Sequence, residues 1–285
     1  MDTLTYWNGT WHEGNPAILG PRDHAFWLGS MVFDGGRAFE GCGPDLDQHA
    51  ERAVRSARVL GLNPKQTPQD ILKLMYEGIR RFGPKAELYV RPLFWPTKSG
   101  VGPISVDPDS CQFALCIYVS PMRAGTPLTL GLCRTIRRPT PESAPTAAKA
   151  SCLYPNSSRG VAEMQQRGFD NGIVLDALGN VAETCSSNIF LAKNGAVSTP
   201  IPNGSFLAGI TRNRTIQLLR DSGVAVRERT VVPGELDDAD ELFTTGNAGK
   251  VQPVSRFESR DLQPGPIARK AHELYMAYAR TQRVI

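Results

Sequence analysis

The stretch GIVLDALGNVAETCSSNIFLAKNGAVSTP, residues 172–200, holds four short apolar runs separated by turn residues. GIVLD and VAETC flank Leu178-Gly179-Asn180, while IFLAK and AVST flank Asn194-Gly195. Both pairs predict two strands joined by a tight turn, and the signal at Asn194-Gly195 is the stronger, because Asn-Gly tolerates the positive φ angles that a tight hairpin requires. Strands that meet through tight turns and are mixed with helices favour an α+β fold.

The chain beyond this stretch mixes helices with further strands. We expect a helix from Thr211 to Ser222 that ends at Gly223, and a last amphipathic helix from Gly265 to Arg280. VAVRERT (224–230) and ELFTT (241–245) predict strands between them. No βαβ run carries GxGxxG, so a Rossmann domain is not expected.

The first 120 residues also alternate strands with helices. The stretch TLTYWNGTWHE predicts a strand pair that turns at Asn8-Gly9. Apolar residues at helical spacing predict a helix from Leu46 to Leu60, and Thr67-Pro68 marks the start of another, because a hydroxyl N-cap precedes a proline. ELYVRPLFW and CQFALCIYV predict strands over residues 87–95 and 111–119.

The length of 285 residues is sufficient for two domains. SPMRAGTP, residues 120–127, combines proline and glycine without periodicity and is typical of a linker. We therefore expect a small α+β domain over residues 1–119, a linker over 120–127 and a larger domain over 128–285.

Composition and charge exclude several classes of protein. The net charge of +4 comes from 32 basic and 28 acidic residues that are interspersed, which argues against nucleic-acid binding. No apolar run approaches the length of a membrane span, and the N-terminus has no secretory signal, so we expect a cytoplasmic protein without membrane partners. No cysteine has metal-ligand spacing, and we expect no metal and reduced, mostly buried thiols at 42, 111, 116, 133, 152 and 185.

A single lysine in TAAKASCLYPNSSRG, residues 146–160, is a candidate reactive group. Lys149 lies among small and apolar residues just before an expected helix. A lysine without a partner usually lays its stem along the surface and keeps its charge in water. The alternative is an amine that loses its proton near neutral pH and acts as a nucleophile and base.

Two features of the second half could support that chemistry. Glu183, in an expected strand, could face solvent or hold its carboxylate against a basic nitrogen. GITRNRT, residues 209–215, places a glycine before a helix start at Thr211, where free N–H groups and the helix dipole favour an anion such as phosphate. A plain connection with a threonine N-cap would explain the same residues.

Two features of the first half point to anions. Arg52, in the HAER stretch, could be a solvated helix residue or bind an anion through its planar guanidinium. Tyr89 and Arg91 are two residues apart on an expected strand, so they share one face and could together bind a carboxylate. A cross-strand ion pair would explain Arg91 equally well.

The order and spacing of these features resemble the class IV aminotransferases, which are pyridoxal-phosphate enzymes of the branched-chain and D-amino-acid aminotransferase type. The resemblance rests on ETCSSNIF (183–190), TP (199–200) and FLAGITR (206–212). It extends over nearly the whole chain through VFDGGRAFEG (32–41), HxxR (49–52), YVRP (89–92), KASCLY (149–154) and TTGNAGKVQPV (244–254).

The resemblance implies a two-domain α+β fold with pyridoxal 5'-phosphate between the domains. Lys149 matches the lysine that binds the cofactor covalently and moves the proton, and Glu183 matches the acid that keeps the pyridine nitrogen protonated. Tyr154 matches the phenol that hydrogen-bonds the ring oxygen. The matching phosphate ligands are Arg52, the backbone of Ile210 and Thr211, and Asn247. The matching substrate-pocket residues are Phe33, Arg37, Tyr89, Arg91 and Ala248.

The implied activity is transamination of branched-chain L-amino acids with 2-oxoglutarate, by a ping-pong cycle through pyridoxamine phosphate, in a homodimer. Arg37, Tyr89 and Arg91 favour a substrate with one carboxylate and an acceptor with two. The pattern differs at three positions: Leu28 replaces a frequent tyrosine, Asn247 a common threonine, and Ala208 the usual proline before GITR. The alternatives are an (R)-selective amine transaminase, a D-amino-acid transaminase, an aminodeoxychorismate-type lyase and a non-catalytic binding protein.

Overall fold

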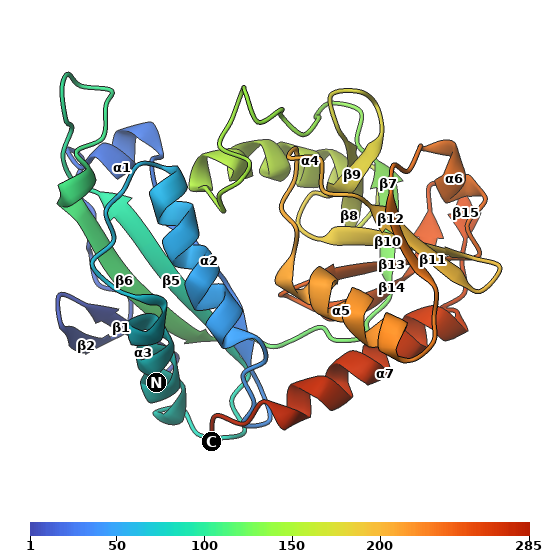
Figure 1. Cartoon of the computed structure of the whole chain (residues 1–285), viewed down its shortest axis with the longest axis horizontal. Coiled ribbons are helices and arrows are strands. Elements are labelled where there is room, and N and C mark those ends of the chain that lie inside the picture. The colour runs from blue at the N-terminus through green and yellow to red at the C-terminus, as the bar shows by residue number, and fades with distance from the viewer. The chain divides into compact units, whose positions relative to one another are not determined.

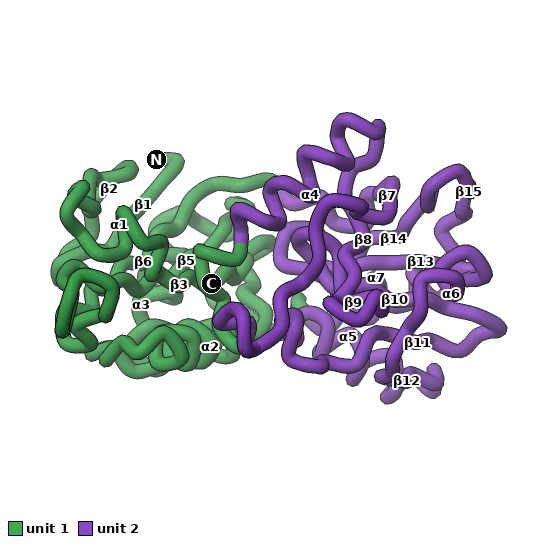
Figure 2. Tube along the Cα trace, turned by 90° about the horizontal axis from the view of Figure 1, so that it is seen from above, with its two compact units in different colours: residues 1–121, 147–153, 279–285 green, residues 122–146, 154–278 purple.

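The computed structural model describes all residues from Met1 to Ile285. It divides into two compact units (Figure 2). Unit 1 contains residues 1–121, 147–153 and 279–285, and unit 2 contains residues 122–146 and 154–278. Residues 120–127 form no helix or strand. Their role as an interdomain linker stays a prediction.

Unit 1 is built on a six-stranded antiparallel sheet. Its strand order is β2-β1-β6-β5-β3, and β4 also pairs with β5. Asn8 and Gly9 have positive φ angles between β1 and β2, which confirms the predicted turn. The strands are β1 (Thr3–Trp7), β2 (Thr10–Glu13), β3 (Val32–Phe33), β4 (Gly36–Ala38), β5 (Leu88–Pro96) and β6 (Cys111–Val119).

The helices α2 (Leu46–Val59) and α3 (Pro68–Arg80) cover one face of this sheet (Figure 1). The short helix α1 (His24–Leu28) precedes β3. Side chains along β5 alternate between the two faces, so Leu88 and Val90 enter the core under the helices. Tyr89 and Arg91 consequently lie on the opposite face. The predicted helices and strands of this unit are confirmed to within one or two residues.

The N-terminus of α3 is stabilised by a capping box at Thr67. Thr67 Oγ1 accepts a hydrogen bond from the Asp70 backbone, and the Asp70 carboxylate accepts one from the Thr67 backbone. Replacing Thr67 with alanine should lower the free energy of unfolding by about 1 kcal/mol, because one N–H loses its cap. Urea unfolding measures this, with Thr230→Ala as an exposed control. Equal unfolding midpoints for the two variants would contradict the prediction.

Unit 2 is built on a nine-stranded mixed sheet of order β12-β11-β10-β13-β14-β7-β8-β9, with β15 paired to β14. The hairpins β8–β9 and β10–β11 are antiparallel, as the opening stretch predicts. The strands are β7 (Leu128–Leu132), β8 (Asn171–Leu175), β9 (Val181–Thr184), β10 (Asn188–Lys193), β11 (Ala196–Pro200), β12 (Val226–Arg229), β13 (Glu241–Gly246), β14 (Lys250–Phe257) and β15 (Arg260–Asp261).

Helices complete unit 2. The parallel pair β11 and β12 requires a crossover, which α5 (Ile210–Asp221) supplies. This helix begins at Ile210, one residue before the predicted Thr211, and its N-cap is Gly209, so Thr211 is not its N-cap. The others are α4 (Tyr154–Gln166), α6 (Gly234–Asp237) and α7 (Pro266–Thr281), whose last residues belong to unit 1.

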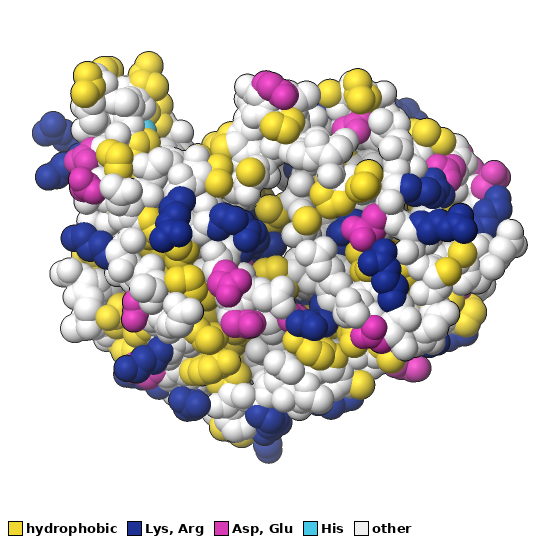
Figure 3. All heavy atoms as spheres, in the orientation of Figure 1, with side chains coloured by type: hydrophobic (Ala, Val, Ile, Leu, Met, Phe, Trp, Pro, Cys, Tyr) yellow, Lys and Arg dark blue, Asp and Glu magenta, His cyan; other side chains and the backbone are white.

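Basic and acidic side chains are intermixed on the face shown in Figure 3, in both units. No helix has the length and hydrophobicity that a membrane span needs. The six cysteines are free thiols, of which four are buried, as predicted.

Candidate active site

The candidate residues are divided between the two units. Unit 1 carries Phe33, Arg37, Arg52, Tyr89, Arg91 and Lys149, and unit 2 carries Tyr154, Glu183, Ile210, Thr211, Asn247 and Ala248.

Lys149 is held in unit 1 by backbone bonds on both sides. Its N–H donates to Ser56 Oγ at 3.1 Å, and its carbonyl accepts from the Phe33 N–H at 3.2 Å. The half-buried side chain places Nζ 5.1 Å from the centroid of the Phe33 ring. The backbone of Lys149 is therefore fixed against β3 and α2, unlike that of a lysine on a mobile surface loop.

The helix α2 presents a buried polar stripe of His49, Arg52 and Ser56. Their spacing of three and four residues places them on one helix face. Asp34, which follows β3 and is fully buried, accepts from Arg52 Nε at 2.6 Å, from Arg52 Nη2 at 2.9 Å and pairs with His49 Nδ1 at 2.6 Å. Arg52 is thus a buried, oriented cation, and the prediction of a solvated helix arginine is wrong.

Asp34 is ionised because of this pairing. Burial by itself would raise the pKa of the Asp34 carboxyl, but the charge and hydrogen bonds of Arg52, with those of His49, outweigh burial. The pKa of Asp34 therefore lies far below its ordinary value of 3.8. The carboxylate holds the Arg52 guanidinium from one edge.

Glu183, on β9 of unit 2, is buried against a cation. Arg138 Nε lies 2.9 Å from Glu183 Oε1, an ion pair rather than an aligned hydrogen bond. Arg138 also donates to the Thr184 carbonyl at 2.9 Å and to Ser157 Oγ at 3.2 Å. Asn188 Nδ2 donates to Glu183 Oε2 at 3.2 Å. The prediction of a solvent-facing glutamate is therefore wrong.

Asn188, the first residue of β10, links Glu183 to the N-terminus of α5. Its Nδ2 also donates to the Leu207 carbonyl at 3.0 Å. A Cβ on Gly209 would lie 2.2 Å from Asn188 Oδ1, so only glycine allows this close approach. Across the strands Asn188 pairs with Thr245, two residues before Asn247. The structure thus brings Glu183, the start of α5 and the loop around residue 247 together near the first residue of β10.

A buried cation and a buried hydroxyl flank the loop of residues 247–249, one at the start of β14 and one near the end of β13. Lys250 is 1% exposed, has a positive φ angle, and its Nζ donates to Asn247 Oδ1 at 3.0 Å. Thr245 Oγ1 is buried and has no hydrogen-bond partner. Ala248 is exposed, and Tyr154 is 36% exposed at the first position of α4.

Arg37, Tyr89 and Arg91 cluster on the face of the unit 1 sheet opposite α2 and α3. The guanidinium carbons lie 5.4 Å (Arg37) and 4.8 Å (Arg91) from the centroid of the Tyr89 ring. A Cβ on Gly35 would lie 2.2 Å from Tyr89 Oη, so this glycine makes room for the phenol. Arg91 has no ion pair, and the prediction of a cross-strand ion pair for it is wrong.

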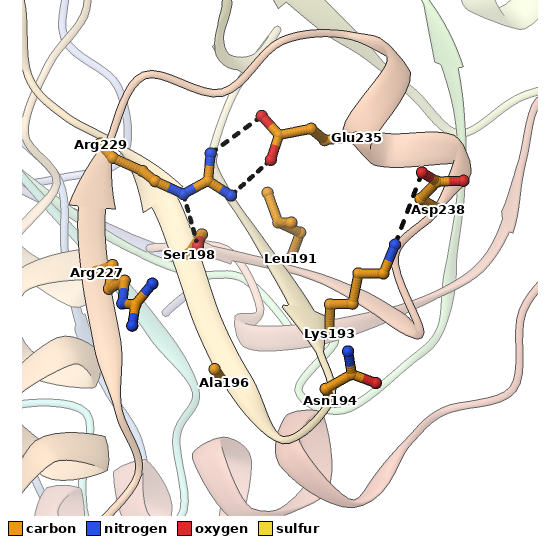
Figure 4. Close-up of a pocket in the computed structure, with 9 residues that line it drawn as sticks. All are labelled: Leu191, Lys193, Asn194, Ala196, Ser198, Arg227, Arg229, Glu235 and Asp238. Atoms are coloured by element: carbon orange, nitrogen blue, oxygen red, sulfur yellow. Dashed lines mark hydrogen bonds and ion pairs between the residues drawn. The ribbon is translucent and has the colours of Figure 1, made fainter.

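A cavity of about 270 Å³ lies elsewhere in unit 2, over β10, β11, β12 and α6 (Figure 4). Four of its five charged side chains form ion pairs: Arg229 binds Glu235 at 2.6 Å, and Lys193 lies 3.6 Å from Asp238, while Arg227 is the fifth. None of the predicted site residues lines it. We therefore assign it no part in the candidate site.

Sequence patterns missed several residues of these clusters: Asp34, Ser56, Tyr118, Arg138, Asn188 and Lys250. A helical count from Arg52 could have identified Ser56, since it continues the same face. Asp34, Asn188 and Lys250 stand inside the quoted motifs, but nothing in their spacing revealed which side chains they meet. Arg138 and Tyr118 carry no local signal, because their partners are distant in the chain.

The candidate residues agree with one protein family. The sequence model of "Amino-transferase class IV" matches residues 31–257. The chain belongs to the class IV aminotransferases. This finding confirms the resemblance inferred from the motifs, and the class IV match spans residues of both units.

Solved structures and curated relatives similar to this chain are also aminotransferases. A crystal structure of an aminotransferase from Brucella abortus bound to the cofactor PLP is 45% identical, with a TM-score of 0.96 over 98% of this chain and 100% of that chain. The crystal structure of the branched-chain aminotransferase of the archaeon Thermoproteus uzoniensis with norvaline is 30% identical, with a TM-score of 0.88 over 97% and 94%. The branched-chain-amino-acid aminotransferase of Escherichia coli K12 is 27% identical over 95% of this chain and 91% of that one. The predicted α+β fold of this family is confirmed.

Proposed function

We propose that this class IV aminotransferase uses pyridoxal phosphate to transfer an amino group between branched-chain L-amino acids and 2-oxoglutarate. The observation that carries the proposal is the 45% identity to the PLP-bound Brucella aminotransferase over 98% of this chain. The buried cluster of Arg138, Glu183 and Asn188 supports it. The Escherichia coli and Thermoproteus relatives support the branched-chain donor. The unpaired Arg91 guanidinium supports an acceptor with a second carboxylate.

The residues of unit 2 fit the phosphorylated end of the cofactor. Gly209 is the N-cap of α5 and no side chain caps the helix, so the N–H groups of Ile210 and Thr211 can donate to an anion, and the helix dipole favours negative charge there. The buried Thr245 hydroxyl, which has no hydrogen-bond partner, is a further donor, and Thr245 lies opposite Asn188 in the sheet. We propose that these groups, with Asn247 and Arg52, hold the phosphate.

The remaining roles follow from the chemistry of each side chain. When bound, pyridoxal phosphate supplies an electron sink for the α-carbon of the substrate. Glu183 would hold a proton on the pyridine nitrogen, and Arg138 and Asn188 fix its two oxygens for that task. Tyr154 would donate to the ring oxygen. Lys149 would attach the cofactor through Nζ, then take the proton from the α-carbon and return it.

Substrate binding is proposed for Phe33, Arg37, Tyr89, Arg91 and Ala248. Arg91 lies among aromatic rings without an ion-pair partner, so its planar guanidinium can receive a carboxylate. An acceptor with two carboxylates gains from this site, whereas pyruvate does not. No observation favours the (R)-selective amine or D-amino-acid alternatives.

The proposed activity has a direct test. Purified protein should be yellow, and L-leucine should discharge the colour, which 2-oxoglutarate should restore in a second half-reaction. A parallel assay supplies (R)-1-phenylethylamine with pyruvate. Turnover only in the second assay would overturn the branched-chain assignment, and a colourless protein that takes up no cofactor would overturn the enzyme assignment.

A cytoplasmic homodimer remains the proposed state of the protein. Large apolar side chains are exposed in unit 1, with Trp27 at 51%, Phe26 at 61%, Ile104 at 76% and Val101 at 98%. Figure 3 shows hydrophobic side chains at the tip of the loop between β5 and β6. His24 contacts the Ile104 carbonyl at 3.0 Å and so joins this loop to α1. Such exposed side chains support a subunit interface, and light scattering measures the mass.

A further inference from the structure

A row of side chains crosses the face of the unit 1 sheet that α2 and α3 leave uncovered. Arg37 on β4 pairs with Tyr89 on β5, and Tyr89 pairs with Tyr118 on β6. The two tyrosine rings stack with centroids 5.3 Å apart and an interplanar angle of 19°. Residues directly opposite each other on neighbouring strands have little freedom to separate, so the sheet fixes both phenols.

Arg91 lies over this stack. Its guanidinium carbon is 4.8 Å from the centroid of Tyr89, 5.2 Å from that of Tyr118 and 5.8 Å from that of Phe33. Aromatic faces attract a cation but leave most of its N–H donors without acceptors. Arg91 Nε is in fact buried without a hydrogen-bond partner. The guanidinium is therefore oriented and able to receive a planar anion.

The hydrogen bond between Arg91 and Tyr118 has only one possible direction. Arg91 Nη2 donates to Tyr118 Oη, because a guanidinium carries donors and no acceptor. The phenol accepts in this bond, so its own hydrogen is left for a different acceptor. Burial raises the pKa of Tyr118 above its ordinary value, although Arg91 opposes the shift, so the phenol keeps that hydrogen at neutral pH.

The pair lies close to the reactive amine within the same unit. The Phe33 ring is 5.1 Å from Lys149 Nζ and 5.8 Å from the Arg91 guanidinium carbon. One aromatic ring thus separates the amine from the Arg91–Tyr118 pair. A substrate held at Lys149 can extend a second carboxylate past Phe33 toward that pair.

We infer that Tyr118 is a second ligand, beside Arg91, for the distal carboxylate of a dicarboxylic acceptor such as 2-oxoglutarate. Arg91 donates from its guanidinium and Tyr118 donates from its hydroxyl to the same group. Tyr118 is thereby a specificity-determining residue that separates dicarboxylic from monocarboxylic acceptors. The identity of the substrate rests on the proposed function. The choice of Tyr118 rests on its contacts with Arg91 in unit 1.

Steady-state kinetics of Tyr118→Phe test this assignment, because the variant keeps the ring stack and loses only the hydroxyl. The ratio kcat/KM for 2-oxoglutarate should fall roughly 10- to 150-fold, mainly through KM, as expected for a hydrogen bond to a charged group. The ratio for pyruvate should stay within about twofold, since no second carboxylate is present to be bound. The control is Tyr6→Phe, whose ring packs on Trp11 and Phe113 in the same unit.

Ligand binding separates the inference from the proposed function. Calorimetry compares glutarate with pentanoate, which has the same length and one carboxylate, on wild-type and Tyr118→Phe protein. Glutarate should bind the variant more weakly and pentanoate should bind both equally. This result is expected even if the donor proves not to be a branched-chain amino acid.

Three outcomes overturn the role of Tyr118. Equal losses for both acceptors would mean that the variant disturbs the site as a whole. Unchanged kinetics with 2-oxoglutarate would mean that the hydroxyl contacts no carboxylate. Equal glutarate affinities of wild type and variant would lead to the same conclusion, whatever the protein turns over.

Discussion

Replacing Lys149 with alanine should lower kcat for transamination by more than about 10⁴-fold. Loss of a general base alone costs about 10²- to 10⁴-fold, and the same Nζ is also the proposed attachment point of the cofactor. Borohydride treatment of wild-type protein should leave the cofactor permanently on the peptide that contains Lys149. Mass spectrometry of digested protein measures this attachment independently of turnover.

The matched control is Lys193→Ala. Lys193 is half-exposed on β10 and lies 3.6 Å from Asp238, outside the candidate site. Its kcat should equal that of wild type, and both variants should fold, since each removes a partly solvated side chain. A Lys149→Ala enzyme with wild-type turnover, or cofactor attached to another lysine after reduction, would contradict the assignment.

Replacing Asp34 with asparagine should lower the free energy of unfolding by about 3–5 kcal/mol, the cost of leaving a buried charge without its partner. Arg52 is 5% exposed and would keep its positive charge after the carboxylate is lost. His49 would lose its anionic partner as well. Urea unfolding followed by circular dichroism measures the change at pH 7.

The stability that Asp34 contributes should depend on pH. Its pKa in the folded protein is far below its ordinary value of 3.8, so the unfolded chain takes up the proton first as the pH falls. The contribution is fully present well above pH 3.8 and is lost progressively as the pH falls below that value toward the folded pKa. The difference between wild type and Asp34→Asn should therefore shrink as unfolding is measured at pH 5, 4 and 3.

The control for this prediction is Asp47→Asn on the exposed face of α2. Asp47 has no ion pair, so the variant should unfold within about 0.5 kcal/mol of wild type at every pH. A destabilisation by Asp34→Asn of the same small size would show that the buried cluster contributes little. A difference that grows as the pH falls would show that the sign of the pKa shift is wrong.

Local chemistry explains why many elements could be predicted. The Asn8-Gly9 and Asn194-Gly195 turns and the Thr67 cap depend on residues next to one another in the chain. Each of these preferences can be recognised in a few consecutive residues of the sequence. The strand order of unit 2 cannot be recognised in this way, because the parallel pairing of β11 with β12 depends on the path of α5.

The sequence by itself determined the family, the hairpins and helices, and which residues are candidates for cofactor and substrate binding, because motifs of fixed spacing carry that information. Only the tertiary structure decided which side chains meet. Asp34 with Arg52, Arg138 with Glu183, and Arg91 with Tyr118 are separated by 18, 45 and 27 residues. Such charges and phenols are oriented by packing and burial, and both arise only when distant segments of the chain come together.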